Sequence, residues 1–193
     1  MDERRLGFAL CGSFCTHKAA LEILRLLARD YDVVPIVSEN AAGTDTRFGK
    51  AEDLLRELES VTGKKPVTTI LEAEAFGPTD PLGALVICPA TGNTLAKLAN
   101  GVTDTAVTMA AKAHLRSDRP LLLAPASNDA MSANLGSIAN LLNRKNVYFV
   151  PMRQDDPVSK PHSLVADFSL VPAALDAMQA GKQLRPLFRT FPV

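Results

Sequence analysis

Short runs of apolar residues alternate along the chain with segments in which apolar residues recur every three or four positions. Because a short, continuous apolar run is typical of a strand buried on both faces, each run predicts a strand of a parallel sheet. Strands are expected at residues 6–11, 32–37, 67–71, 84–88, 120–124 and 147–150. The run at 67–71 is the weakest of these and is expected near a sheet edge.

The segments between these runs predict helices, because their apolar residues fall on one helical face. Gly63 is suited to end the second of these helices, and Pro172 to begin the last, which reaches about Ala180. The segments 38–47 and 151–162 are polar or proline-rich and are expected to be loops. One or two further helices are expected across 93–117. The apolar stripes of the other helices are Ala20, Ile23, Leu24 and Leu27; Ala51, Leu54, Leu55 and Leu58; and Met131, Leu135, Ile138 and Leu142.

Alternating strands and helices predict an α/β fold, a doubly wound, Rossmann-like parallel sheet of about six strands with helices on both faces. If the strand order is 3-2-1-4-5-6, the switch point lies between the first and fourth strands. Residues 1–181 are expected to form a single domain. The segment 182–193 is expected to be a loose tail, whose apolar residues are available to pack on a neighbouring subunit: Leu184, Leu187, Phe188 and Phe191.

Composition narrows the function classes. The 193 residues carry 21 basic and 21 acidic side chains, so no basic excess points to nucleic acid or to an anionic membrane. No apolar run is long enough to span a bilayer, and the polar start shows no signal peptide. The odd cysteine count, without metal-ligand spacing, fits a reducing cytoplasm and no metal site. Cys11, Cys15 and Cys88 are expected to be small buried residues at strand ends, although a helix N-terminus could lower the pKa of Cys15.

Two unusual loops follow the first and fourth predicted strands, so the switch point brings them to one crevice. Gly12 and Ser13 offer backbone N–H groups and a hydroxyl before a helix, which suits a single phosphate; the alternative is a helix cap. The pattern G-x-G-x-x-G of dinucleotide sites is missing. The second loop is small and polar and can line a planar ring or start a helix; it comprises Pro89, Ala90, Thr91, Gly92, Asn93 and Thr94.

Further loops extend this candidate crevice. Ser38 follows the second strand and can reach a phosphate or cap a turn, and Ala126, Ser127 and Asn128 follow the fifth strand. Asp129 is a candidate cap for the next helix. The histidines are scattered and form no Ser-His-Asp pattern, so no catalytic residue is assigned. Three cations lie in polar loops, where they would either meet an anionic substrate or simply be surface charges: Arg47, Arg153 and Lys160.

The segment 89–104 resembles the Pro-Ala-Ser-Ala-Asn-Thr signature of the homo-oligomeric flavin-containing decarboxylase family, including its lysine, glycine and aspartate at Lys97, Gly101 and Asp104. The resemblance implies an FMN site, with Gly12, Ser13 and Ser38 at the phosphate. The segments 89–94 and 126–127 would form the rest of the site. It also implies a homo-oligomer, a trimer or higher.

Within that family the chain is similar to the B subunits of dipicolinate synthases, in the blocks 12–16, 38–41, 44–53, 111–116 and 154–157. This resemblance implies a partner, the dipicolinate synthase A subunit, which carries NADP. The pair would oxidise a dihydrodipicolinate precursor to dipicolinate in the mother-cell cytoplasm of a sporulating bacterium. Arg47, Arg153 and Lys160, assisted by Asn128, would bind the dicarboxylate.

Two departures from the decarboxylases bear on the chemistry. Their histidine between the second helix and the fourth strand has no counterpart, since residues 61–83 contain no histidine, and Ser127 replaces their methionine. Two alternatives stay open beside the synthase subunit: a flavin-dependent decarboxylase, and a non-catalytic scaffold that has lost flavin.

Overall fold

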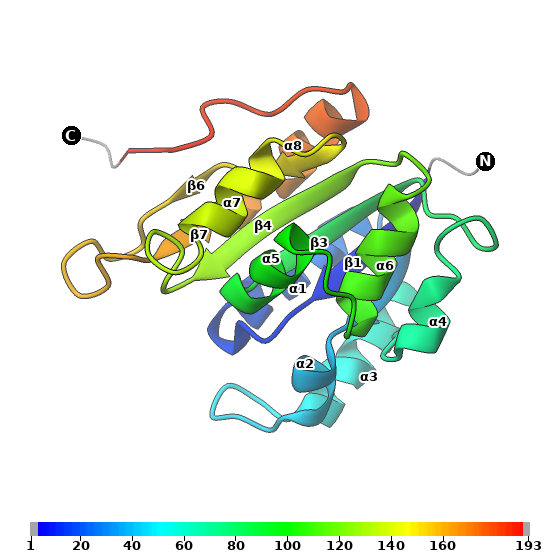
Figure 1. The fold of residues 1–193 in the computed structure, drawn as a ribbon. Coiled ribbons are helices and arrows are strands. Elements are labelled where there is room, and N and C mark those ends of the chain that lie inside the picture. Colours follow the sequence, from blue (N-terminus) through cyan, green and yellow to red (C-terminus); the bar gives the residue numbers. More distant parts are fainter. Residues whose placement is uncertain (1–3, 191–193) are drawn as a thin grey trace.

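The computed structural model describes residues 4–190 and contains one mixed sheet (Figure 1). The strand order is β2-β1-β3-β4-β7-β6, and β5 also pairs with β4. The strands are β1 (Arg5–Leu10), β2 (Asp32–Val37), β3 (Ala84–Ala90), β4 (Leu121–Ser127), β5 (Val147–Phe149), β6 (Met152–Arg153) and β7 (Leu164–Ala166).

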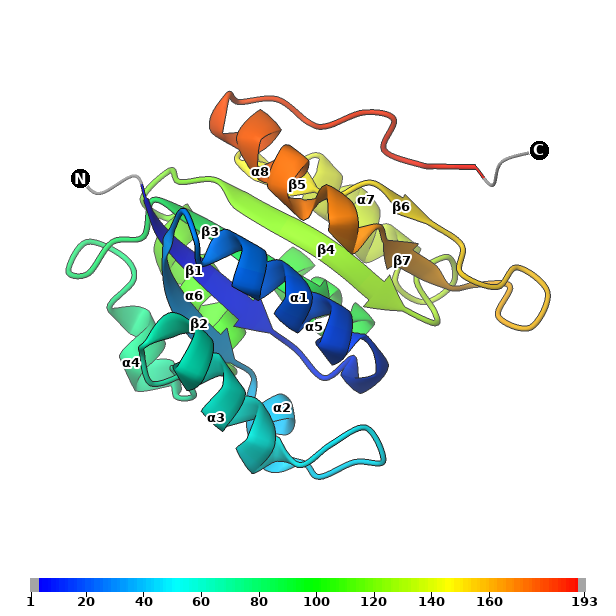
Figure 2. The same ribbon diagram turned by 180° about the vertical axis from the view of Figure 1, so that it is seen from behind.

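Helices cover both faces of this sheet (Figures 1 and 2). Helices α5, α6 and α7 lie on one face, and α1, α3 and α8 on the other. The helices are α1 (His17–Leu27), α2 (Glu39–Gly43), α3 (Ala51–Thr62), α4 (Ile70–Glu74), α5 (Gly92–Ala99), α6 (Ala106–Leu115), α7 (Leu135–Leu142) and α8 (Val171–Gln179), with 3-10 turns η1 (Phe14–Thr16) and η2 (Phe168–Leu170).

Alternation along each central strand feeds two apolar cores. Phe8 and Leu10 of β1 pack in the core under α1 and α8, whereas Ala9 and Cys11 pack in the core under α5 and α6. Because both faces are covered, β3 and β4 are buried at every position. This explains why the chain shows continuous apolar runs rather than apolar–polar alternation.

The predicted doubly wound arrangement is confirmed for the centre of the sheet. Strand β1 pairs in parallel with β2 and β3, and β4 pairs in parallel with β3 and β5. The predicted strand at 67–71 is reduced to a parallel bridge between Val67 and Ile36. The residues after it turn into α4, because Thr69 and Glu72 form a capping box at that helix.

The prediction of an all-parallel sheet is wrong at one end. The loop expected at 151–162 begins in β6, and β7 returns antiparallel to both β6 and the end of β4. Ala126 pairs with Val165, and Ser127 pairs with Leu164. This hairpin therefore lies beside the carboxyl end of β4, where a parallel sheet places its ligands. The polar segment 38–47 likewise contains the short helix α2.

We expected the segment after α8 to be loose. In the structure it is hydrogen-bonded to the rest of its own chain. The Gln183 side chain accepts a hydrogen bond from Phe149 N at 2.8 Å, and Met152 N donates to Leu187 O at 2.8 Å. Phe188 forms a parallel bridge with Met152 and stays 55% exposed. Its packing on a neighbouring subunit stays a prediction, and Phe191 lies outside the described residues. No helix between residues 4 and 190 is long and apolar enough to cross a membrane.

Candidate functional site

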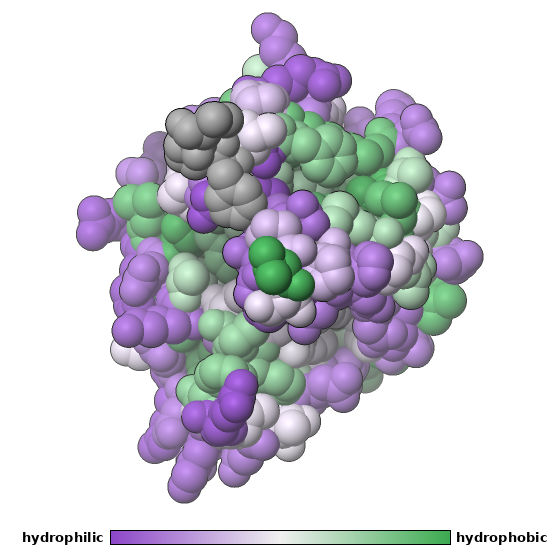
Figure 3. All heavy atoms as spheres, turned by 90° about the vertical axis from the view of Figure 1, so that its left-hand side faces the viewer, coloured by the Kyte–Doolittle hydropathy of each residue, from purple (hydrophilic) through white to green (hydrophobic). Residues whose placement is uncertain are grey.

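The loops after β1 and β3 meet because these two strands are neighbours in the sheet. Both loops lie at the carboxyl end of the sheet. Figure 3 views the molecule from this side and shows apolar patches among polar side chains. At the floor, the Thr94 hydroxyl donates a hydrogen bond to the Cys11 Sγ at 3.2 Å. The two loops are therefore in contact, whereas a ligand crevice between them stays a prediction.

Gly12 and Ser13 form a tight turn into η1, and α1 begins only at His17. The sequence suggested that these two residues lie directly at the N-terminus of α1, but η1 separates them from it. Ser13 N donates to Cys11 O at 2.9 Å, and Ser13 O accepts from the Thr16 hydroxyl at 2.8 Å. Among residues 4–190 the Ser13 hydroxyl has no hydrogen-bond partner, so it is available to a ligand.

The second loop begins as the end of a strand. Pro89 and Ala90 are the last, buried residues of β3, and Thr91 is the N-cap of α5. The Thr91 hydroxyl accepts from Thr94 N at 3.3 Å. Asn93 lies exposed in the first helical turn. The helix-cap reading is therefore correct, and it is compatible with a ligand site, because the cap leaves the Asn93 side chain outside.

At Gly92, the start of α5 closely approaches residues at and after the end of β4. A Cβ added there would lie 2.6 Å from the Asn134 Nδ2, 2.6 Å from the Ser127 Oγ and 2.8 Å from the Asp129 Oδ1. The Ser127 hydroxyl donates to the same Asp129 carboxylate. The end of β4 thus packs polar atoms against the start of α5 at a distance that only glycine permits.

Ser38 joins the crevice from β2. Its backbone N–H donates to Leu10 O at 3.0 Å, and its hydroxyl accepts from Ala41 N at 3.4 Å to cap α2. The Glu39 carboxylate accepts from Ala106 N at 3.0 Å and so holds α2 against the start of α6. Ser38 is therefore brought to the same edge as Gly12 and Ser13 (see β1 and β2 in Figure 2), while also serving as a cap.

The three predicted substrate cations are not brought together. Arg47 lies in the loop between α2 and α3, with its guanidinium 4.8 Å from the centre of the Phe48 ring. Lys160 pairs with Asp155 at 2.9 Å in the β6–β7 connection, and that contact raises the pKa of Lys160. Arg153 lines a cavity of about 400 Å³ on a different face of α1 from the Arg47 loop.

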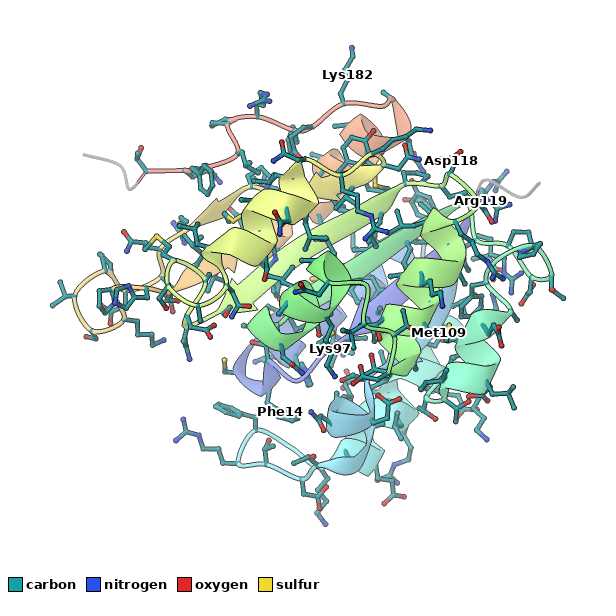
Figure 4. All side chains as sticks on the ribbon, viewed as in Figure 1. Phe14, Lys97, Met109, Asp118, Arg119 and Lys182 are labelled. Carbon is teal, nitrogen blue, oxygen red and sulfur yellow. The ribbon has the colours of Figure 1, made fainter. Side chains whose placement is uncertain are left out.

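The remaining predicted residues have definite places. Asn128 is exposed where β4 ends. Lys97, labelled in Figure 4, comes from α5. It pairs with Asp104 at 2.9 Å, and this contact lowers the pKa of the Asp104 carboxyl. Because Gly101 has φ +70° between these two partners, the lysine, glycine and aspartate of the motif close the turn from α5 to α6.

Burial shifts the pKa values of the titratable groups beside the contact between the two loops. The His17 Nε2 donates to Cys11 O at 2.7 Å, and burial lowers the pKa of His17. Burial raises the pKa of the Cys11 thiol to about 11 and raises that of Cys88 as well. Cys15, in contrast, is exposed, so the expectation that all three cysteines are buried is wrong for it. No group of histidine, cysteine and carboxylate side chains within 4–190 is arranged to hold a metal.

Sequence reasoning missed two sets of residues. Asn134 contacts Gly92 from 42 positions away, and nothing in its local sequence signals this. Phe14 and Phe48 line a cleft of about 530 Å³ between α1 and the 44–50 loop. An aromatic residue in each of two polar, glycine-containing loops was a signal available in the sequence.

Comparison with known proteins bears on the crevice as a whole. The Flavoprotein family matches residues 1–169. The dipicolinate synthase B subunit of Bacillus subtilis (strain 168) is 40% identical over 185 residues, which cover 95% of this chain and 92% of that protein. The crystal structure of the dipicolinate synthase B subunit from Bacillus halodurans C has a TM-score of 0.89 and 37% identity, covering 97% of this chain and 96% of its own.

A more distant neighbour shares the same fold. The FMN-dependent cysteine decarboxylase SpaF has a TM-score of 0.66 and 26% identity, covering 90% of this chain and 96% of its own. The family match covers the strands β1 to β4 and the loops that form the crevice. This chain therefore belongs to the Flavoprotein family and is a homologue of the dipicolinate synthase B subunit.

Proposed function

We propose that this chain is the B subunit of a dipicolinate synthase, binds FMN at the carboxyl edge of its sheet, and acts with an NADP-binding A subunit. Together they would oxidise a dihydrodipicolinate precursor to dipicolinate. The observation that carries the proposal is that the 12–13 and 91–94 loops meet, joined by the hydrogen bond from the Thr94 hydroxyl to the Cys11 Sγ. They do so in a chain that is 40% identical to such a subunit. The proposal places the chain in the mother-cell cytoplasm as a trimer or higher homo-oligomer.

The residues at the crevice fit FMN. The Ser13 hydroxyl has no partner within the described chain, and the absence of a side chain at Gly12 lets a ligand approach the backbone. Gly12, Ser13 and Ser38 would hold the phosphate. The segment 91–94, with Ala126 and Ser127, would lie along the ring. A bound flavin, or the nicotinamide of the partner, would supply the hydride acceptor.

The protein's own part is to bind and orient the substrate. A dihydropyridine dicarboxylate loses a hydride and a proton as it becomes aromatic, and it carries two negative charges throughout. Cations must therefore face its carboxylates. Arg47 is the cation we propose for this role. Arg153, Lys160 and Asn128 are the alternative set, because they lie in β6, in the β6–β7 connection and after β4, not in the loop that carries Arg47. Because Arg47 and Phe48 are exposed, replacing Arg47 with alanine should reduce turnover far more than it reduces stability.

The test is a reconstitution in which each component is omitted in turn. Purified chain, FMN, the A subunit and NADP are mixed, and dipicolinate formation is followed. Ser13→Ala and Asn93→Ala should weaken FMN binding about tenfold, since each removes one polar contact to the ligand. Ser60→Ala, on the exposed side of α3, is the matched control and should bind FMN normally. Dipicolinate formation that needs neither this chain nor FMN would refute the proposal.

A flavin-dependent decarboxylase is the second candidate, favoured by the likeness to SpaF. The absence of histidine from 61–83 argues against it. Release of carbon dioxide from an acyl-cysteine substrate would support this candidate. A colourless protein that FMN cannot titrate would instead support a scaffold that has lost flavin.

A further inference from the structure

A second hollow lies beside the crevice, between α1 and the connection from α2 to α3. Its volume is about 530 Å³, within the usual range for small-molecule sites. In Figure 4 the Phe14 side chain points from η1 toward that connection. The cleft has an apolar lining with an aromatic ring from each side: Phe14, Leu21, Ala41, Phe48, Ala51 and Leu54.

Two of the acidic residues at this cleft are neutralised within the chain. Glu57 forms an ion pair with Arg25, and Asp53 forms one with Arg56. Both pairs join or lie on the helices that flank the cleft. These carboxylates therefore do not set the charge that a ligand would meet.

The lining carries three cations and three carboxylates, and a positive excess remains only among those that make no ion pair. Lys18 and Lys50 line it and make no ion pair among residues 4–190. Arg47 does not itself line the cleft, but its guanidinium lies 4.8 Å from the ring centre of Phe48, which does. Glu22 is the one lining carboxylate without an ion pair in the same range. Exposed cations beside a half-exposed aromatic ring favour a ligand that is both planar and anionic.

We propose that this cleft binds a planar aromatic dicarboxylate, with the ligand ring against Phe14 and Phe48 and its carboxylates facing Lys18, Lys50 and Arg47. The inference rests on the proposed function, because it assigns the substrate and product class of that reaction to one place. It also separates two of the candidate cations: Arg47 lies next to the lining residue Phe48, whereas Arg153 lines a different cavity.

The test is calorimetric titration of the purified chain, with and without saturating FMN, using pyridine-2,6-dicarboxylate. Lys50→Gln, Arg47→Gln and Phe48→Ala should each weaken binding about tenfold, as expected for loss of one charged or stacking contact. Lys65→Gln, on the exposed turn after α3, is the matched control and should leave the affinity within about twofold. Thermal melting of each variant checks that it is folded.

Ligand chemistry provides a second arm. Benzene-1,3-dicarboxylate should bind like the pyridine compound, whereas benzoate, with one charge, and cyclohexane-1,3-dicarboxylate, without a planar ring, should bind at least about tenfold more weakly. Binding should also weaken with added salt. Equal binding of the saturated ring would show that the aromatic walls do not recognise the ligand, and would overturn the proposal.

The remaining outcomes distinguish this inference from the proposed function. No binding in either flavin state, or binding lost through Arg153→Gln but kept in the cleft variants, overturns the cleft assignment even if the reconstituted pair forms dipicolinate. If the wild-type chain binds the dicarboxylate through the cleft while the complete reconstitution yields no dipicolinate, the cleft stands and the proposed function fails.

Discussion

The hydroxyl of Thr94 donates to the Sγ of Cys11 at 3.2 Å and so joins the loops that follow two neighbouring strands. The same hydroxyl lies 3.0 Å from the Thr91 hydroxyl, which caps α5. The bond therefore fixes the start of α5 relative to the Gly12–Ser13 turn. The width of the candidate flavin crevice depends on this relative position.

Replacing Thr94 with valine keeps the side-chain shape and removes the shared hydroxyl. The free energy of unfolding should fall by about 1–2 kcal/mol, because the buried Thr94 hydroxyl loses its hydrogen bonds with Thr91 and Cys11. FMN affinity should fall as well, because α5 is no longer held to the first loop. Urea unfolding and FMN fluorescence titration measure the two effects. Thr103→Val, outside the crevice, is the control, and equal FMN binding by the two variants would contradict the link.

The three cysteines should differ sharply in reactivity. Burial raises the pKa of Cys11 to about 11 and also raises that of Cys88, so both are protonated thiols shielded from solvent at neutral pH, whereas Cys15 is exposed. One thiol per folded chain should react with a thiol reagent, and all three after denaturation. Cys15→Ser should abolish the fast reaction. Rapid modification of Cys11 in the folded chain would show that the crevice floor is open.

Replacing Gly92 with alanine should be costly, since the new Cβ would lie 2.6–2.8 Å from polar atoms of Ser127, Asp129 and Asn134. Overpacking of this kind destabilises by roughly 1–3 kcal/mol. Gly136→Ala in α7 is the matched control, because a Cβ there meets nothing within 4 Å and alanine favours a helix. Thermal unfolding should rank Gly92→Ala below and Gly136→Ala at or above the wild type. The reverse order would contradict the close approach of β4 to α5.

Much of the fold could be predicted because the central strands are buried on both faces and therefore consist of continuous apolar runs. The runs at 6–11, 84–88 and 120–124 each contain or overlap a strand of the sheet. The run at 67–71 was misjudged because Thr69 and Glu72 cap a helix there, and local capping outweighed a short apolar pattern. The short strands β6 and β7 were missed because β7 is held by pairing with β4 and β6 by pairing with β7, not by their own composition.

The candidate site was predictable to the same extent as its strands. Residues 12–13 and 91–94 follow strands that are adjacent in the sheet, so topology placed them together. The contact of Asn134 with Gly92 and the separation of Arg47 from Arg153 depend on how loops return to the sheet. No pattern along the chain encodes that return path.

His114 should make folding stability depend on pH. It is fully buried; its Nε2 donates to Pro120 O at 2.9 Å, and its Nδ1 has no partner within the described chain. Burial lowers the pKa of His114 from 6.5 to about 4. Between pH 6.5 and about 4, His114 therefore binds a proton in the unfolded chain but not in the folded chain. The stability contributed by neutral His114 is complete above pH 6.5 and is lost as the pH falls toward 4.

Between pH 7 and pH 5 this loss should amount to about 2 kcal/mol. The measurement is urea unfolding across that range for the wild type, for His114→Leu and for the exposed His162→Leu. His17, whose pKa burial also lowers, adds a loss of the same sign to all three proteins, so only the differences between them report His114. His114→Leu should show the smaller pH dependence, and His162→Leu should follow the wild type. Equal slopes for wild type and His114→Leu would mean that His114 becomes protonated in the folded state, which its burial in the core should prevent.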